Sequence, residues 1–204
     1  MKLLNIIFGL LWISTSAFSQ QGWTLDKEKD GIKLSSRKSA TSSFNDIRVE
    51  VDMPGTLEQL AVILMDIPKY TTWAYATKKA TLVKTLGPGN VIYFSEYEVP
   101  WPATNRYFYA NFELKVDSPT HSMNVRSTSI PGYKPEITDL APVPYSKGVW
   151  NVKQISPKTI HIDYILELNP GGSLPAWVIN LFTTKGPLMT FENIKQKMSA
   201  LNPG

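Results

Sequence analysis

The chain has 204 residues, of which 43% are hydrophobic, and it contains no cysteine. This length is enough for one domain with a substantial core, and the lack of cysteine excludes disulfides, thiol nucleophiles and cysteine-bound metals. The formal charge of +4 is mild, and no basic run or nucleic-acid-binding motif accompanies it, so we expect no nucleic-acid partner. Transient contact with an anionic membrane surface stays open.

The first 19 residues are typical of a secretory signal peptide. Lys2 gives a positive start, residues 3–13 are an apolar run, and Ala17-Phe18-Ser19 is a small-x-small cleavage pattern. The apolar run is much shorter than the roughly 20 residues that a membrane-spanning helix needs. We therefore expect export, to the periplasm if the cell is Gram-negative or otherwise by secretion, and a single mature domain over residues 20–204.

The next segment mixes short strands with one helix. A helix or extended lead-in precedes a strand at residues 32–37, and alternating apolar residues predict a second strand at 44–51. Thr56 and Gln59 then have the spacing of a capping box, which predicts the start of a helix. We expect that helix to end near Ile67, because the residue before a proline avoids the α-helical region.

A series of antiparallel strands is expected to follow. Residues 106–116 alternate most clearly, with Arg106, Phe108 and Phe112 on one face and Tyr107 and Tyr109 on the other. A strand, a helix, a long run of strands and a final helix make an α+β order. The expected strands are residues 81–86, 91–99, 106–116, 122–128, 148–155 and 159–168.

The last helix is expected to begin after a turn at residues 169–172, Asn-Pro-Gly-Gly. Ser173 is a suitable N-cap, and Pro175 suits the first turn, where a missing N–H costs nothing. A bulky apolar face at helical spacing follows, which predicts that the helix lies on a concave apolar surface and closes a cavity. The residues of that face are Leu174, Trp177, Val178, Leu181 and Phe182.

Residues 183–187, Thr-Thr-Lys-Gly-Pro, interrupt this helix. Because an interior proline removes a hydrogen bond and glycine weakens a helix, we predict a kink here. Two interpretations stay open: the kink is a hinge that lets the first half of the helix tilt as a lid, or it fits the helix to the sheet.

Two stretches resemble one known family. Residues 169–182 resemble the segment with which START (StAR-related lipid-transfer) domains enter their last helix, with Asn169 in place of the usual Asp. Residues 99–106, Val-Pro-Trp-Pro-Ala-Thr-Asn-Arg, resemble the Pro-Trp-Pro and Asn-Arg segment of the same family, with Tyr107 where an Asp usually follows. The resemblance runs in order from about Trp23 to the end of the chain.

The resemblance implies the helix-grip fold of the START and Bet v 1-like superfamily, in which a curved antiparallel sheet wraps around a long C-terminal helix and a shorter helix follows an early strand. It also implies binding of a lipid or sterol, with transfer and sensing both open. A proline-rich segment at residues 130–147 corresponds to a loop that borders the cavity mouth in such folds. That segment is either a gate or a plain surface loop.

We expect a cavity lined mainly by aromatic side chains. Arg106 is the one charged residue in phase with them, and a buried arginine needs an anionic partner, either a protein carboxylate or a ligand head group. The expected ligand-binding residues are Trp73, Phe94, Arg106, Phe108, Phe112, Trp150, Trp177, Leu181 and Phe182.

The chain shows no enzymatic signature. Its two histidines, His121 and His161, lack the spacing of metal ligands, and no nucleophile elbow, P-loop or dinucleotide motif occurs. We expect a monomer without metal, cofactor or catalytic residues, whose partner is a lipid or another hydrophobic molecule. Two alternatives remain: a cyclase- or hydratase-like enzyme using Arg106, Tyr93 or Asp163, and an envelope interaction module with a vestigial pocket.

Overall fold

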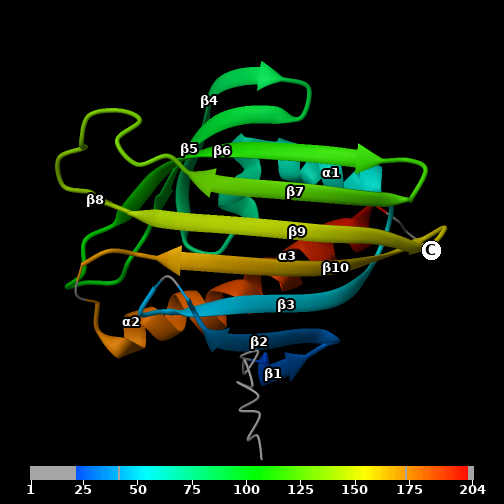
Figure 1. Cartoon of the computed structure of the whole chain (residues 1–204), viewed down its shortest axis with the longest axis horizontal. Helices are drawn as coiled ribbons and strands as arrows, with labels where there is room; N and C mark the ends of the chain where they lie inside the picture. Colours follow the sequence, from blue (N-terminus) through cyan, green and yellow to red (C-terminus); the bar gives the residue numbers. More distant parts are fainter. Residues whose placement is uncertain (1–21, 41, 173, 202–204) are drawn as a thin grey trace, which may run out of the picture.

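The structure is a computed structural model, and it describes residues 22–40, 42–172 and 174–201. The expected signal peptide lies outside the described residues and stays a prediction, and Ser173, the expected N-cap, also lies outside them. Everything from residue 24 onward that forms regular structure belongs to one antiparallel sheet and to helices that pack on one of its faces (Figure 1).

The sheet has ten strands in the order β1-β2-β3-β10-β9-β7-β6-β5-β4, with β8 paired to β6. All neighbouring pairs are antiparallel except β6 and β8. The α+β class and the helix-grip architecture are therefore confirmed. The strands are β1 (Thr24–Lys29), β2 (Ile32–Lys38), β3 (Asn45–Pro54), β4 (Thr77–Gly87), β5 (Asn90–Tyr97), β6 (Arg106–Asp117), β7 (Ser122–Ser129), β8 (Ala141–Pro142), β9 (Tyr145–Ser156) and β10 (Thr159–Asn169).

The capping box opens the first helix, α1 (Leu57–Met65), as predicted. The Thr56 hydroxyl accepts a hydrogen bond from the Gln59 backbone N–H at 3.3 Å, and the Gln59 side-chain oxygen accepts one from the Thr56 N–H at 3.0 Å. The helix ends at Asp66, and a 3₁₀-helix, η1 (Ile67–Thr72), follows with Pro68 in its first turn. Proline therefore ends one helix and begins the next.

The C-terminal helical segment has three parts: α2 (Ala176–Asn180), a π-helical turn η2 (Leu181–Lys185) and α3 (Gly186–Ala200). The predicted interruption at 183–187 is thus a π-helical turn, which overlaps that range. The helix begins at Ala176 with Pro175 as its N-cap, and no side chain caps it. The helix therefore starts later than the sequence indicated, and the prediction that Ser173 is the N-cap and that Pro175 lies in the first turn is wrong.

Helix α3 packs on the concave face of the sheet through the apolar series that the sequence shows. Leu188, Phe191, Ile194 and Met198 are at most 4% exposed. Leu201, which continues the series, is 53% exposed because it lies at the C-cap, beyond the sheet contacts. Helix α3 contacts β2 and β3, and it lies behind the sheet in the view of Figure 1.

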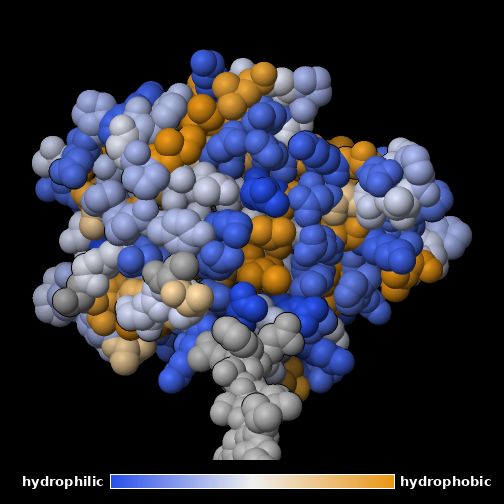
Figure 2. All heavy atoms as spheres, in the orientation of Figure 1, coloured by the Kyte–Doolittle hydropathy of each residue, from blue (hydrophilic) through white to orange (hydrophobic). Residues whose placement is uncertain are grey.

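The opposite face of the sheet carries most of the polar side chains. Figure 2 shows that face as mainly hydrophilic, with small apolar patches between charged residues. Among residues 22–201 that the structure describes, no helix has the length and apolar character needed to cross a membrane.

Candidate functional site: a cavity beneath the C-terminal helices

A cavity of about 190 Å³ lies between the sheet and the helices. Its wall comes from the inward face of strands β5, β6, β7, β9 and β10, from the end of η1, and from the C-terminal helical segment. The C-terminal segment contributes Leu174, Phe182, Gly186, Pro187, Thr190 and Phe191. Most of the wall is apolar or aromatic, as expected of a small-molecule site.

Six of the nine predicted ligand-binding residues line this cavity. They come from four separate parts of the chain, so the fold brings together residues that are far apart in sequence. Their contact with a ligand stays a prediction. These residues are Trp73, Arg106, Phe108, Phe112, Trp150 and Phe182.

Phe94 is not among the lining residues, because it lies on the outer face of the sheet. It pairs with Tyr109 across β5 and β6, and its ring packs against Tyr107 and Tyr109 at 6.1 and 5.2 Å. Its neighbour Tyr93 pairs with Ala110 and faces the cavity instead. Phe94 was predicted to line the cavity because it is aromatic, but the pairing of β5 with β6 decides which face its ring lies on.

Trp177 and Leu181 also lie outside the cavity wall. Trp177 is 48% exposed, and Val178 is the one buried residue of α2. Leu181 begins the π-helical turn and is partly exposed. Val178 and Phe182, which are four residues apart, lie on the inward side, whereas Trp177 and Leu181 lie beside them on the other side. The inward face is therefore narrower than the sequence predicted.

Tyr75 and Thr190 line the cavity, but no pattern in the sequence marked them. The Tyr75 backbone N–H donates to the Thr190 hydroxyl at 3.0 Å, and its ring meets Phe182 at 6.5 Å. Gly186 permits this approach, because a Cβ there would lie 3.0 Å from the Tyr75 ring. The Gly-Pro pair at 186–187 was the available signal, and it marked a kink rather than a close contact.

Buried phenols line the deep part of the cavity. The Tyr70 hydroxyl donates to the Leu64 carbonyl at 2.6 Å, and Tyr93 and Ser127 share a hydrogen bond of 2.9 Å. Burial raises the pKa of Tyr70 and of Tyr93 well above the usual value, because the interior disfavours the phenolate. Both groups stay neutral hydrogen-bonding groups at any physiological pH.

The raised pKa of Tyr93 predicts a loss of stability in alkali. In the folded state the Tyr93 hydroxyl keeps its proton. Its contribution to the free energy of unfolding is therefore complete below the pKa of the unfolded chain, near 10, and is lost as pH rises above that value. Between pH 10 and 11, the stability gap between wild type and Tyr93→Phe should shrink by about 1 kcal/mol. Urea unfolding of both proteins measures it, since lysine titration cancels in the difference. Parallel pH profiles would contradict the prediction.

Arg106, the first residue of β6, is 8% exposed and lines one end of the cavity. Its Nε donates to the Pro170 carbonyl at 3.3 Å, and Nη1 donates to the Thr104 carbonyl. Within the described residues, no carboxylate forms an ion pair with it. The described residues therefore do not supply the carboxylate partner that was one of the two sequence-based interpretations.

The proline-rich segment contributes to both faces of the sheet. Val143 and Ser146 line the cavity, whereas residues 130–140 lie over the outer face. There the Ile137 N–H donates to the Tyr107 hydroxyl at 3.4 Å, and Tyr133 packs on Tyr109 at 5.3 Å. The segment thus covers the outer aromatic cluster, and a gating role for it stays a prediction.

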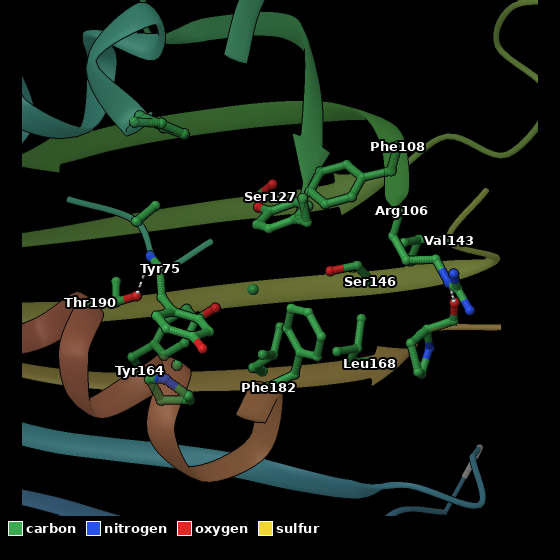
Figure 3. A pocket seen from close by; sticks show the side chains of 18 of the residues that line it. Tyr75, Arg106, Phe108, Ser127, Val143, Ser146, Tyr164, Leu168, Phe182 and Thr190 are labelled. Carbon is green, nitrogen blue, oxygen red and sulfur yellow. Dashed lines mark hydrogen bonds between the residues drawn. The ribbon is translucent and has the colours of Figure 1, made fainter. Parts of the chain in front are cut away.

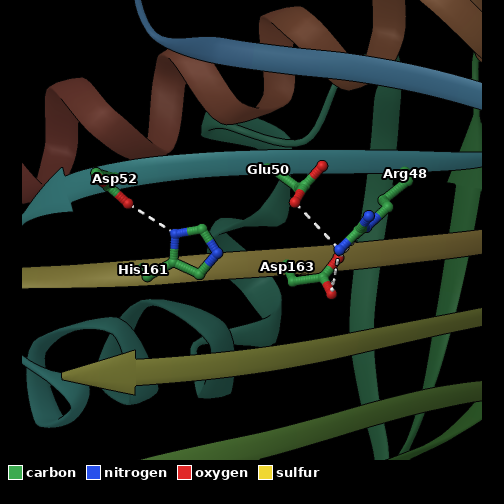
Figure 4. Close-up of polar contacts among 5 residues, drawn as sticks. All are labelled: Arg48, Glu50, Asp52, His161 and Asp163. Carbon is green, nitrogen blue, oxygen red and sulfur yellow. Dashed lines mark hydrogen bonds and ion pairs between the residues drawn. The ribbon is translucent and has the colours of Figure 1, made fainter. Parts of the chain in front are cut away.

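The charged side chains of β3 and β10 lie away from the cavity (Figure 4). Arg48 donates to both carboxylate oxygens of Asp163 at 2.8 and 3.0 Å, and His161 pairs with Asp52 at 2.7 Å. Asp163, considered above as a cavity group, is therefore a partner of Arg48 on the outer face. In the described part of the chain, no group of three or more acidic or histidine side chains is placed to hold a metal.

Comparison with known proteins identifies similar chains. No protein-family profile matches. An uncharacterized protein of Pseudomonas aeruginosa is 26% identical over 177 residues, 86% of each chain. The phosphatidylcholine transfer protein of Bos taurus is 25% identical over 177 residues, covering 83% of this chain and 81% of that one.

The fold has solved counterparts. The crystal structure of a STAR-related lipid transfer protein from Xanthomonas axonopodis superposes with a TM-score of 0.78 at 24% identity, covering 87% of this chain and 99% of that one. Its strand and helix arrangement therefore extends over nearly all of the described residues.

Proposed function

We propose that this chain, which has the fold of the StAR-related lipid-transfer (START) domains, binds a lipid or another hydrophobic small molecule in the cavity closed by its C-terminal helices. The fold confirms the resemblance seen in the two sequence motifs. We further propose that the protein carries or senses this molecule rather than converting it.

The observation that carries this proposal is the composition of the cavity wall. Aromatic and aliphatic side chains from the sheet face those of the terminal helices, and the space between them is unfilled by the protein itself. Burying about 400 Å² of apolar ligand surface contributes roughly 10 kcal/mol before the costs of association. That gross energy is sufficient to hold a lipid out of water.

Two exposed tryptophans support transient contact with a membrane surface. Trp101, in the loop before β6, is 89% exposed, and Trp177 of α2 is 48% exposed. Both tryptophans belong to segments next to Arg106. Trp101 lies in the loop that leads into Arg106, and Trp177 follows Pro170, whose carbonyl accepts a hydrogen bond from Arg106. Tryptophan is enriched at membrane–water interfaces because its ring is apolar and its N–H is polar.

The expected signal peptide supports a place of action outside the cytoplasm, where a carrier would move lipids between envelope surfaces. A single-chain carrier without a partner subunit is the simplest arrangement, and size-exclusion chromatography with light scattering tests it. The enzyme alternative is weaker, because Asp163 lies on the outer face and the Tyr93 hydroxyl is engaged by Ser127.

Native mass spectrometry of the protein purified from its own host tests the proposal. We expect a population heavier than the polypeptide by the mass of one lipid, and an organic extract should contain that lipid. Protein found at the polypeptide mass alone, which also takes up no lipid from vesicles of host lipids, would contradict the proposed function and favour an interaction module.

A further inference from the structure

Arg106 defines one end of the cavity. In Figure 3 its side chain lies beside Val143 and Leu168, at the opposite end from Tyr75, Tyr164 and Thr190. The cavity therefore has a charged end and an end enclosed by aromatic rings. An amphiphilic ligand has the same two-ended character.

The guanidinium has no countercharge among the residues that the structure describes. Its two hydrogen bonds go to neutral backbone carbonyls, and for Nη2 no acceptor occurs within the described residues. Gly172 leaves Nη2 uncovered, because a Cβ atom at residue 172 would lie 3.7 Å from this nitrogen. Because arginine stays charged even when burial lowers its pKa, an unpaired buried guanidinium is costly to the empty protein.

The acidic side chains of the adjoining strands already have other partners. Glu96 pairs with Lys78 at 3.1 Å and accepts a hydrogen bond from Asn105. Glu167 pairs with Lys147 at 3.1 Å and accepts one from Tyr145 at 2.8 Å. Neither carboxylate pairs with Arg106, so its charge is left for an anion that the described residues do not supply.

The other end of the cavity suits an apolar chain. Trp150, Tyr164 and Phe191 pack together there with ring centroids 4.7–5.4 Å apart. The cavity of about 190 Å³ lies below the roughly 300–1,000 Å³ of most small-molecule pockets. The space is therefore too small for the two chains of a diacyl lipid and favours a ligand with a single acyl chain.

We infer that the ligand is a single-chain amphiphile with an acidic head group, a carboxylate or a phosphate, which pairs with Arg106 while its chain extends toward Trp150 and Phe191. This inference rests on the proposed function. A planar guanidinium with a free N–H edge suits the oxygen atoms of either anion. The charge of the empty site is thereby neutralised when the ligand binds.

Competition in native mass spectrometry tests the inference with the full-length mature protein stripped of lipid. The probes are hexadecanoate, hexadecyl phosphate, the uncharged hexadecanol of equal chain length, and a dihexadecanoyl phosphatidic acid. We expect the wild type to prefer at least one of the acidic single-chain probes over hexadecanol by about tenfold or more. Comparing hexadecanoate with hexadecyl phosphate then separates a carboxylate from a phosphate ligand.

The variant Arg106→Gln should reduce this preference to about one, because it removes the charge. Lys153→Gln, which removes an exposed cation from β9 on the outer face, should keep the wild-type preference. If Arg106→Gln does not fold, as judged by its thermal transition, the wild-type preference alone decides.

Equal binding of hexadecanoate, hexadecyl phosphate and hexadecanol by the wild type would overturn the inference. So would a preference that persists in folded Arg106→Gln, or binding of the two-chain probe alone. In each of these results a hydrophobic molecule still binds, so the proposed function stands. Failure of all four probes to bind would count against both.

Discussion

A Ser146→Phe variant is expected to fold and to retain less than about a tenth of the lipid that copurifies with the wild type. Ser146 lies on β9 opposite Leu168, and its side chain points into the cavity near Phe182 (Figure 3). A phenyl ring at this position occupies the space that the acyl chain would fill. Ligand binding is then lost because the volume is lost.

The fold should tolerate this substitution. Ser146 donates a hydrogen bond through its backbone N–H to the Ser129 hydroxyl at 2.9 Å, and the new ring enters space that is already empty. Filling it should cost less than the 1–3 kcal/mol typical of overpacking a full core. Circular dichroism and urea unfolding measure the fold, and quantitative extraction measures the lipid.

Lys153→Phe is the matched control, since it adds the same ring to the same strand on the outer face, where residue 153 is exposed. It should retain wild-type amounts of lipid. If Ser146→Phe folds and still carries lipid at the wild-type level, the cavity is not the binding site. A loss of lipid in both variants would point to a general effect of the added ring.

The face of β6 was predictable from the sequence, whereas the face of β5 was not. In β6 the alternation of Arg106, Phe108 and Phe112 with Tyr107 and Tyr109 is visible in the strand itself. In β5 a run of adjacent buried residues, Tyr93 and Phe94 among them, hides the alternation. Register with the neighbouring strand decides which ring faces inward, and a single strand does not contain that information.

In the terminal helices, the spacing of apolar residues predicted one part of the buried side correctly and another part wrongly. The spacing of Leu188, Phe191, Ile194 and Met198 predicted the buried side of α3, because an α-helical period holds across all four. Trp177 was misplaced because the inward side of this segment is narrow and carries Val178 and Phe182, whereas the neighbouring Trp177 is exposed. The contact of Tyr75 with Gly186 and Thr190 joins segments more than 100 residues apart, and such packing leaves no local pattern.

Phe191→Ala should lower the free energy of unfolding by about 3–5 kcal/mol, as is usual for a phenylalanine removed from a core. Phe191 is 1% exposed, and its ring lies 5.0 Å from Trp150 of β9 and 5.4 Å from Tyr164 of β10. These three rings anchor α3 to the centre of the sheet. Their loss removes both buried apolar surface and the contact that positions the helix.

Met189→Ala, on the exposed side of the same helix, is the matched control. Met189 is 36% exposed, so its truncation should cost no more than about 0.5 kcal/mol. Urea unfolding of lipid-free protein measures both variants. Equal costs for the two would mean that α3 is not held by the aromatic cluster.

Phe191 also lines the cavity, which makes its deletion informative about the ligand. The void left by the ring joins the existing space, so a bound chain can fill part of it. Stability measured with saturating ligand should therefore fall less than stability measured without it, because ligand binding to the folded state adds to the free energy of unfolding. A loss that is the same in both conditions would place the ligand away from Phe191 and thus away from the aromatic end of the cavity.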